Sequence, residues 1–522
     1  MKTFRGAWPL AGLVAGAAGL ATSYFVAMVM AIRESPIVAV AEEAIRLTPG
    51  GIAEKAIQVF GHKDKTVLVV VILILMGFLF AYAGQLARRA WWAPAIVFLV
   101  LAGVGAVAVI DQRAATTTDV LPVVVGFVTW LVCLSLLTEP LRRGELLQRE
   151  VAEHSPGTSA GGLSGLHDHT RRGFVLRSVA LVGVAGALGF FGRTVGAGRR
   201  HVEEARRLLR LSGVSSPLVP PKARLDVTGI TSWMTPANDF YQIHTAIIVP
   251  AVEPKNWSLR IHGMVEREIV LTYDELLARQ TTEAWITLNC VSNPVGGPLI
   301  GNAWWSGVRI ADLLAQAGVS PDADAVLQTS EDGWTCGTPL ATLTDDRDAM
   351  LAVAMNGQPL PLEHGFPVRT IVPGLYGYVS ATKWVVDMEV SRFSDFEAYW
   401  TGKGWGEQGP VKMSSRIDVP GSGDTVGGGD VTFAGVAWSQ HTGIEAVHVA
   451  IDGGGWQPAE ISAPPTNDTW VQWVARVPVA AGDHVARVRA TDKTGLEQTG
   501  VERDVLPDGA TGWHTIDFTV GE

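Results

Sequence analysis

The stretch "LPLEHGFPVRTIVPGLYGYVSATKWV", residues 360–385, sets three cationic or potentially cationic side chains among apolar, strand-like residues. They are His364, Arg369 and Lys383, and glycine and proline punctuate the apolar runs between them. Arginine presents a planar fork of donors that fits a phosphate group, and lysine adds a compact positive charge. The stretch therefore predicts a site for a phosphorylated ligand, with ordinary surface ion pairs as the alternative.

A second stretch, "WITLNCVSNPVGGPLIGNAWWSGV" at residues 285–308, carries a cysteine at the end of a short strand. Cys290 is followed by a loop with Gly296 and Gly297, where the backbone can approach a ligand closely. A thiolate is the ligand that soft metals select, although many free cysteines are simply small buried hydrophobic residues. Cys290 is therefore either a metal ligand or a core residue, and a disulfide with Cys336 is a third possibility.

Around these two stretches the chain has the pattern of an α+β domain. Between residues 225 and 400, short apolar strands mix with helical pieces such as "LTYDELLARQ", and Gly- and Pro-rich turns separate them. A charged stem and a Pro- and Ser-rich linker, residues 196–224, precede this domain. Beyond a second linker, segments such as "VTFAGVAWS" and "HVARVRATD" alternate apolar with polar residues, which predicts a β-sandwich over residues 410–522.

Residues 1–195 are predicted to form an all-α membrane region. A bilayer core needs about 20 apolar residues per helix. Five apolar runs come close to or reach that length: residues 8–32, 66–83, 91–110, 120–137 and 174–191. The alternative is that the shortest runs are buried helices of a soluble protein. The runs hold no histidine and no mid-helix Asp or Glu, which disfavours haem ligation and transport and favours an anchor or docking platform.

The distribution of Lys and Arg predicts how these helices are oriented. With the first residues inside, nine basic residues fall on the cytoplasmic side and six on the outer side. Five spans then deliver everything after residue 192 to the extracytoplasmic side. The first outer loop, "VAVAEEAIRLTPGGIAEKAIQVFG" at residues 38–61, is amphipathic and is expected to lie on the membrane surface. A net charge of −10 without a basic stripe argues against a nucleic-acid partner.

A third stretch, "PANDFYQIHTAIIVP" at residues 236–250, completes a pattern. The three stretches in this order resemble the sulfite oxidase family of molybdenum enzymes, over about residues 225–522. The resemblance implies a molybdopterin cofactor, an Ig-like fold for the C-terminal sandwich and possible homodimerisation through it. Cys290 matches the cysteine that ligates molybdenum, so it is the predicted metal ligand and catalytic residue. A disulfide would remove that ligand, and Cys336 is therefore expected to be a core or pocket residue.

The resemblance also implies which residues bind the cofactor. His364 and Arg369 match the pair that grips the pterin and its phosphate, and Lys383 matches the basic residue that ends that motif. The other predicted cofactor-binding residues are Asn238, Tyr241, Gln242, His244 and Ser330, and all of these except His244 match the bacterial branch that reduces methionine sulfoxide.

Two departures from the family pattern concern the substrate. Sulfite oxidases proper carry an arginine in an "R-N-H" run where this chain reads "FYQIHT", so His244 either substitutes for that cation or contacts the cofactor. They also carry a tyrosine before "MNG", where this chain has Val353 in "LAVAMNG". The residues therefore support the cofactor better than they support sulfite as the substrate.

The predicted function is that of a membrane-anchored, extracytoplasmic oxidoreductase that transfers an oxygen atom to or from a small substrate, either sulfite or an S- or N-oxide. The chain shows no haem-binding CxxCH motif, so a separate cytochrome or quinone-linked protein is expected to exchange electrons with it. The alternative from another class is a metal-free, membrane-anchored binding module that keeps the fold.

One further stretch, "DHTRRGFVLRSVALVGVAGALGFFG" at residues 168–192, resembles an export signal placed far inside the chain. Its Arg171 and Arg172 lie in "TRRGFVL", which resembles the twin-arginine address for exporting folded proteins. A molybdopterin domain normally receives its cofactor in the cytoplasm, so such a domain must fold before it crosses. The alternative is two positive-inside arginines before an ordinary helix.

Overall fold

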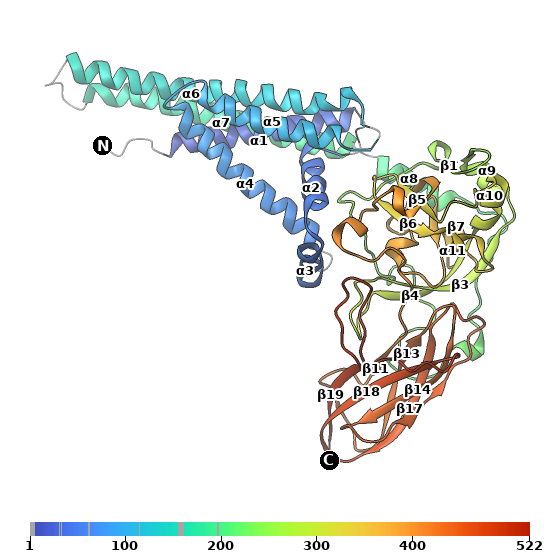
Figure 1. The fold of residues 1–522 in the computed structure, drawn as a ribbon. Coiled ribbons are helices and arrows are strands. Elements are labelled where there is room, and N and C mark those ends of the chain that lie inside the picture. Colours follow the sequence, from blue (N-terminus) through green and yellow to red (C-terminus); the bar gives the residue numbers. More distant parts are fainter. Residues whose placement is uncertain are drawn as a thin grey trace. The chain divides into compact units, whose positions relative to one another are not determined.

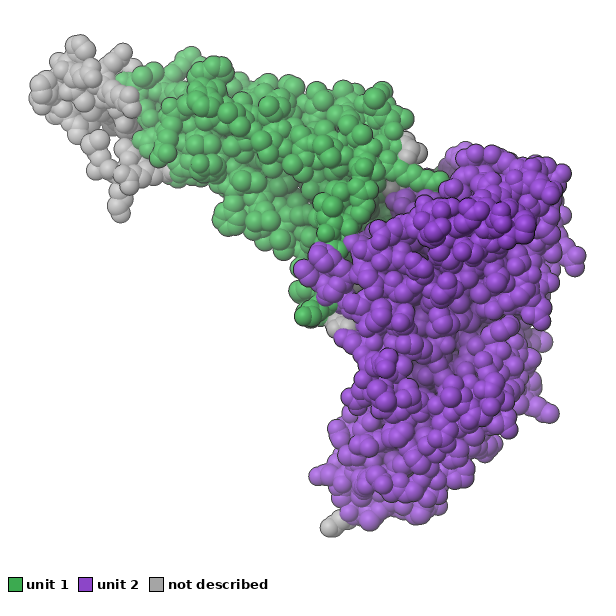
Figure 2. Space-filling model, in the orientation of Figure 1, with its two compact units in different colours: residues 1–48, 55–201, 245–248 green, residues 49–54, 202–244, 249–522 purple. Residues whose placement is uncertain are grey.

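The structure is a computed structural model that describes residues 6–30, 32, 34–60, 63–113, 115–154, 161–195 and 198–521. The chain divides into two compact units (Figure 2). The first unit, drawn in green, comprises Met1–Thr48, Lys55–His201 and Thr245–Ile248. The second unit, drawn in purple, comprises Pro49–Glu54, Val202–His244 and Val249–Glu522.

The first unit is a bundle of helices (Figure 1). Among the described residues, five stretches are long and apolar enough to cross a membrane, and they lie in α1 (Ala7–Val29), α4 (Asp64–Ala87), α5 (Ala93–Ile110), α6 (Leu121–His154) and α7 (Gly161–Val195). Each of the five predicted apolar runs therefore contains a helix, although α1 ends at Val29 inside the run 8–32, and α6 and α7 extend well beyond the runs 120–137 and 174–191. Helix α1 packs against α4, α6 and α7, and α5 packs against α6.

Small residues let the helices of this bundle approach one another closely. A Cβ atom added to Gly12 of α1 would collide with the backbone carbonyl of Phe80 in α4, and one added to Gly84 of α4 would collide with the carbonyl of Trp8. Trp130 of α6 donates its indole N–H to the carbonyl oxygen of Gly16 at 3.0 Å. Close backbone contact of this kind is how helices associate where the solvent is as apolar as the side chains.

Two shorter helices, α2 (Pro36–Leu47) and α3 (Gly50–Phe60), connect α1 with α4 and correspond to the predicted amphipathic stretch. Residues Pro49–Glu54, at the start of α3, belong to the second unit. The stretch is thus largely helical, as its amphipathic pattern suggests. The first turn of α3 belongs to the same unit as the predicted site residues.

The second unit begins with two β-sheets. The first sheet has the strand order β2-β1-β10-β5-β6, formed by Ile269–Thr272, Ser258–Gly263, Val385–Ser391, Ala325–Ser330 and Thr335–Pro339. The second has the order β3-β4-β7-β8, with β9 also paired to β7, and is formed by Thr282–Asn289, Ile300–Arg309, Met350–Met355, Gln358–Pro359 and Arg369–Ile371. The short helices α9 (Tyr273–Leu277), α10 (Ile310–Ala317) and α11 (Leu340–Thr344) complete an α+β arrangement.

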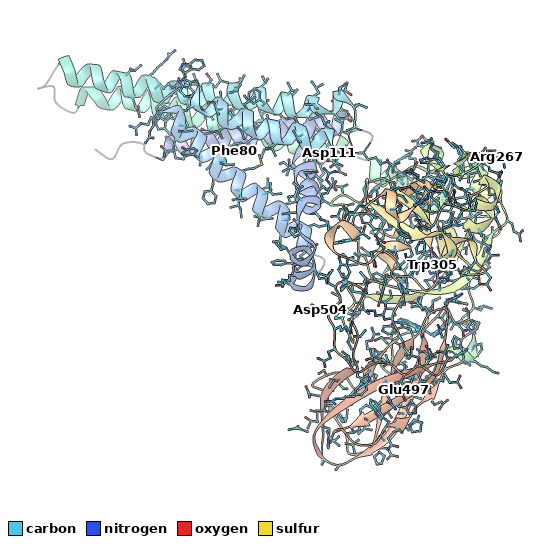
Figure 3. The ribbon with its side chains drawn as sticks, viewed as in Figure 1. Phe80, Asp111, Arg267, Trp305, Glu497 and Asp504 are labelled. Carbon is cyan, nitrogen blue, oxygen red and sulfur yellow. The ribbon has the colours of Figure 1, made fainter. Side chains whose placement is uncertain are left out.

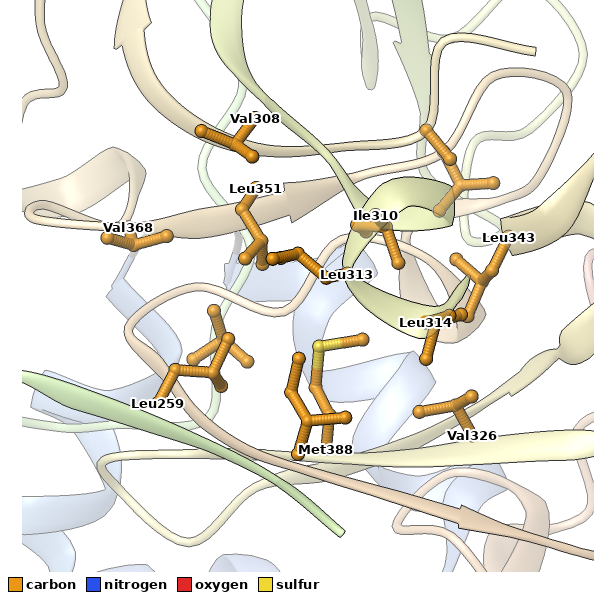
Figure 4. Close-up of a cluster of buried hydrophobic side chains, with 14 of the residues drawn as sticks. Leu259, Val308, Ile310, Leu313, Leu314, Val326, Leu343, Leu351, Val368 and Met388 are labelled. Atoms are coloured by element: carbon orange, nitrogen blue, oxygen red, sulfur yellow. The ribbon is translucent and has the colours of Figure 1, made fainter. Parts of the chain in front are cut away.

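A buried hydrophobic cluster joins these elements (Figure 4). Leu313 and Leu314 of α10 are fully buried and face Met388 of β10, Leu259 of β1 and Leu351 of β7. Helix α10 ends at Gly318, whose φ of 72° is a left-handed conformation that favours glycine. The cluster fixes both sheets against the same helix, which holds the strand ends that carry the predicted site residues.

The C-terminal part of the second unit consists of two further sheets. Their orders are β11-β13-β17-β16 and β12-β19-β18-β14-β15, and the main strands are β11 (Ser414–Val419), β13 (Gly429–Trp438), β14 (Ile444–Ile451), β17 (Val471–Val479), β18 (Gly482–Asp492) and β19 (His514–Val520). Side chains from both sheets share one core, with Phe433 and Trp473 from the first sheet and Val488 and Phe518 from the second. Two sheets that share a core form a sandwich.

Residues within the predicted linker are partly structured. Gly198–Leu208 forms helix α8, and its Val202 is buried with Phe240, Ile286 and Trp305 in a core cluster of the second unit. Arg206 of the same helix donates to the carbonyl oxygen of Pro359 at 3.2 Å. The charged stem is therefore a helix that packs one apolar side chain into the domain that follows it.

Candidate active site

Cys290 lies where strand β3 ends. The register pairs Asn289, the last residue of β3, with Ile300 of β4, so residues 290–299 form the loop between them. The Cys290 amide donates to the carbonyl oxygen of Leu299 at 3.0 Å, and the Asn293 side chain accepts from the Leu299 amide at 2.9 Å. The two hydrogen bonds join the two ends of the loop and hold Cys290 at the point where the loop begins.

The Cys290 thiol is buried and free. The pKa of this thiol is raised to about 11, mainly by burial and in part by the charge of Glu54, whereas the Ser292 amide and hydroxyl and the charge of Lys383 oppose that rise. The thiol is therefore neutral at ordinary pH. A bound metal cation would deprotonate it, because a coordinating thiol loses its proton to the metal.

Cys336, the other cysteine of this domain, is also free and buried. Its sulfur lies 3.1 Å from the hydroxyl oxygen of Thr382. Burial raises the pKa of this thiol to about 11 as well. The structure thus places Cys336 in the core, as expected, and not in a disulfide with Cys290.

Arg369 is the first residue of strand β9 and is almost completely buried. Its guanidinium donates to the carbonyl oxygens of His364 at 3.1 Å and Ala381 at 3.4 Å, and it lies 5.2 Å from the centroid of the Trp305 ring. Trp305 is labelled in Figure 3. Within the described part of the chain, no carboxylate forms an ion pair with Arg369. Burial accordingly lowers its pKa to about 10.

His364 is buried with one ring nitrogen satisfied and one not. Its Nε2 lies 2.9 Å from the carbonyl oxygen of Ala237, so this nitrogen must carry the proton and donate it. Nδ1 is then an acceptor, and it is buried without a hydrogen-bond partner. Burial, followed by the charges of Lys383 and Arg369, lowers the pKa of His364 to about 3, so the ring stays neutral. Nδ1 of His364 is therefore a buried acceptor that a hydrogen-bond donor of a ligand could reach.

Lys383 lies at the end of the same stretch. Its ammonium donates to the carbonyl oxygen of Glu363 at 2.8 Å and lies 3.4 Å from Nδ1 of His244. Trp384, which follows it, has a φ of 51° and donates its indole N–H to the carbonyl oxygen of Leu362 at 3.0 Å. A left-handed backbone is costly for a bulky residue, so the tertiary contacts must hold it there.

Gly365 brings the two ends of the stretch together. Its φ is 106°, and a Cβ atom there would lie 3.0 Å from Cβ of Arg369 and 3.1 Å from Cα of Lys383. Only glycine meets both demands without strain. His364, Arg369 and Lys383 are therefore neighbours in space as well as in sequence.

Tyr241 joins the same group from a distant segment. It is half-buried by exposed area, its ring stacks on that of Phe240 with centroids 5.2 Å apart, and its hydroxyl lies close to Gly377. Burial raises its pKa, the charge of a Cys290 thiolate would raise it further, and Arg369 opposes the rise. Tyr241 thus lies within electrostatic reach of both Cys290 and Arg369.

The remaining predicted site residues are less closely tied to this group. Asn238 is exposed and follows Ala237, whose carbonyl oxygen holds His364, and Gln242 is half-buried next to Tyr241. In the described residues, neither amide side chain has a hydrogen bond to the rest of the predicted set. Ser330 is buried at the end of β5, opposite Val385 of β10, and its hydroxyl donates to Asp332 in its own turn.

Two groups at this site were missed in the sequence. Oδ1 of Asn289, directly before Cys290, is buried without a hydrogen-bond partner. Glu54, from helix α3, accepts a hydrogen bond from the Ser292 hydroxyl at 2.7 Å. Asn289 could have been inferred from its place at the strand end, whereas Glu54 had no signal because its partner is 238 positions away.

Taken together, the group presents a buried thiol, a buried guanidinium without a carboxylate, an unpaired imidazole acceptor and an unpaired amide oxygen. A buried cation is normally paired, and a buried polar atom is normally hydrogen-bonded. The arrangement fits a ligand that brings a thiolate-binding metal, an anionic group such as a phosphate, and its own hydrogen-bond donors. Such a ligand would satisfy the groups that the protein alone leaves unsatisfied.

Comparisons with known proteins agree with this chemistry. Residues 246–400 match the protein family described as the oxidoreductase molybdopterin binding domain. Cys290, Ser330, His364, Arg369 and Lys383 fall inside the matched segment, and Asn238, Tyr241, Gln242 and His244 precede it.

Several characterised and uncharacterised proteins are similar to this chain. It is 30% identical to sulfite oxidase of Gallus gallus over 338 residues, covering 54% of this chain and 72% of that protein. It is 31% identical to YuiH, an uncharacterized oxidoreductase of Bacillus subtilis, over 178 residues, covering 34% of this chain and 86% of that protein. It is 30% identical to human mitochondrial sulfite oxidase over 297 residues, covering 48% of this chain and 54% of that protein. The chain thus spans about half the length of the mitochondrial sulfite oxidases.

Among solved structures, the sulfane dehydrogenase SoxCD from Paracoccus pantotrophus matches 60% of this chain and 88% of that chain. The sequence identity is 24% and the TM-score is 0.46.

Proposed function

The chain belongs to the sulfite oxidase family of molybdopterin-binding oxidoreductases, and on that premise we propose that it catalyses oxygen-atom transfer to or from a small S- or N-containing substrate. The observation that carries the proposal is the buried, carboxylate-free guanidinium of Arg369 in the same cluster as the free thiol of Cys290. A binding module without a cofactor would have no use for a buried guanidinium that lacks a carboxylate partner among the described residues in the same site as a buried free thiol, so the enzyme is favoured over the metal-free alternative.

The proposed role of each residue follows from the chemistry of its side chain and from the partner that this side chain lacks. Cys290 ligates the metal as a thiolate, Arg369 pairs with the phosphate, and Nδ1 of His364 accepts a hydrogen bond from the pterin. Lys383 neutralises the cofactor tail, with His244 as its hydrogen-bonding neighbour, and Tyr241 lines the site next to Cys290. Asn238, Gln242 and Ser330 complete the proposed set. When bound, the molybdenum cofactor supplies two-electron oxygen-atom transfer chemistry, and the protein orients it.

The substrate is proposed to be an S- or N-oxide in preference to sulfite. Sulfite is an anion, and this chain lacks the arginine that binds the anion in sulfite oxidases proper. Where those enzymes have a tyrosine, Val353 of β7 is an apolar residue buried in the core. A pocket without that cation and that phenol binds an anion less well.

The setting of the enzyme is part of the proposal. The five apolar helices anchor the chain in the cell membrane, and the site faces the extracytoplasmic side, where a separate cytochrome or quinone-linked protein exchanges electrons with it. The domain boundaries are proposed as residues 1–195, 196–224, 225–400 and 410–522, with the last an Ig-like sandwich that supports a homodimer. Alternating buried and exposed positions in β18 and β19 support the sandwich.

Purification with metal analysis tests the proposed function directly. The full chain, solubilised from membranes of a host that makes the cofactor, is expected to contain about one molybdenum per chain. A screen with artificial electron carriers should then find turnover with S- or N-oxides. A chain that carries no molybdenum although the host supplies the cofactor would overturn the proposal.

A second prediction concerns export. The side chain of Arg171 lies outside the described residues, and Arg172 is exposed at the start of the last apolar span, Arg172–Arg193. Replacing both by lysine keeps the charge but removes the receptor-read signal, so the site-bearing domain is expected to remain inside the cell. Protease accessibility in spheroplasts measures this. The double variant Arg142→Lys and Arg143→Lys is the matched control, and normal export of the Arg171 and Arg172 variant would refute the signal.

A further inference from the structure

Glu54 is a buried carboxylate next to the loop that carries Cys290. It lies on the first turns of α3, in the segment Pro49–Glu54 that is part of the second unit, and its exposed fraction is 7%. Its Oε2 accepts a hydrogen bond from the Ser292 hydroxyl at 2.7 Å. Ser292 is itself buried and follows Cys290 by two positions. Burying a carboxylate costs free energy unless the group is hydrogen-bonded, so the hydrogen bond to Ser292 ties Glu54 to the loop that carries Cys290.

The segment is held against the second unit at another point. A Cβ atom on Gly50 would collide with the backbone oxygen of Lys403, so the chain passes Lys403 at a distance that only glycine allows. Glu54 follows one helical turn later, which places its side chain on the same face of α3 as Gly50. Two independent contacts therefore fix where the carboxylate lies.

Ser292 links Glu54 to the predicted metal ligand. The Ser292 amide and hydroxyl both lower the pKa of the Cys290 thiol. The hydroxyl has one proton, and in the structure it is donated to Glu54. Glu54 thus holds the hydroxyl of a residue that lies two positions after Cys290.

We propose that Glu54 is a positioning residue of the metal site, which holds the Ser292 turn against Cys290 and places a negative charge close to the metal ligand. The inference rests on the proposed function, because the metal is the molybdenum of the cofactor. Groups outside the ligand set orient the ligands and tune the metal. Negative charge near a metal favours its more oxidised, more positive state, so Glu54 lowers the reduction potential of the bound metal.

The test is a spectroscopic redox titration of the molybdenum in the full-length, loaded protein. Glu54→Gln keeps an oxygen that can accept from Ser292 but removes the charge, so the molybdenum content should stay at the wild-type level while the midpoint potential becomes more positive. Glu54→Ala removes both, and the molybdenum content should also fall several-fold. Ser292→Ala frees the carboxylate from the loop and should shift the potential in the same direction, by less.

Glu43→Gln is the matched control. Glu43 lies on the neighbouring helix α2, where it pairs with Arg46 of the same helix at 2.8 Å, and its neutralisation should leave both the potential and the molybdenum content unchanged. Wild-type potentials and metal contents in Glu54→Gln and Glu54→Ala would overturn the inference while leaving the proposed function intact. A wild-type protein without molybdenum would instead sink the proposed function itself.

Discussion

Replacing Cys290 by serine is expected to abolish turnover while the protein still folds. Serine has nearly the same shape but is not the soft ligand that a thiolate is, so the metal loses its only protein ligand in the proposed site. Changes to groups outside the ligand set already cost about 10- to 100-fold at metal sites, so loss of the ligand itself should cost at least about a hundredfold. Turnover per molybdenum, measured with artificial electron carriers, checks the result.

Cys336→Ser is the matched control for this experiment. Cys336 is a second free thiol of the same domain, is also buried, and contacts Thr382, outside the proposed cofactor-binding set. The control should keep its activity, and both variants should keep a thermal unfolding midpoint close to that of the wild type. Turnover of Cys290→Ser at the level of Cys336→Ser would mean that Cys290 is not the metal ligand.

The part of the site that the sequence revealed is the part that is local. His364, Arg369 and Lys383 fall within 20 positions of one another, and a glycine at position 365 folds the stretch so that they meet. Their residue types carry the chemistry whatever the details of the fold. The strand before Cys290 was likewise visible, because a short apolar run that ends in a polar residue and a glycine loop is a local signal.

Three features could not be read from the sequence, each for a physical reason. The pairing of β9 with β7 brings Arg369 into the same sheet as β3, the strand that Cys290 follows. Strand pairing across such separations in sequence depends on the whole fold. The tautomer of His364 depends on which carbonyl oxygen its Nε2 meets, here that of Ala237. Glu54 belongs to an amphipathic helix whose sequence pattern also fits a membrane surface. The pattern alone therefore does not reveal that this carboxylate is buried and hydrogen-bonded to Ser292.

In the helical region, the secondary structure could be predicted from the sequence and the packing could not. Five long apolar helices of this region were predicted, because an uninterrupted apolar run of sufficient length permits few other structures, although α6 and α7 extend well beyond the predicted runs 120–137 and 174–191. What the runs do not specify is how the helices pack. That depends on single small residues such as Gly12 and Gly84, which matter only because they face one another.

Replacing Arg369 by methionine is expected to remove the cofactor from the purified protein. In the structure the guanidinium has backbone carbonyl oxygens and an aromatic ring around it, and within the described residues no carboxylate, so a phosphate would be its counter-charge. Charge-assisted hydrogen bonds of this kind are worth roughly 3 kcal/mol, about a hundredfold in affinity. Molybdenum and pterin content of protein purified under identical conditions measures the loss.

Arg369→Lys separates charge from geometry, because lysine keeps the positive charge but lacks the planar fork, so its cofactor content should fall between those of the wild type and the methionine variant. Arg347→Met is the matched control, since Arg347 is also mostly buried but is already paired with Asp345 at 2.8 Å. The cofactor-free Arg369→Met protein should unfold at no lower temperature than cofactor-free wild type, because a buried cation without a counter-charge costs stability. Full cofactor content in Arg369→Met would show that this guanidinium does not bind the phosphate, and a lower unfolding temperature would show that its carbonyl contacts serve the fold instead.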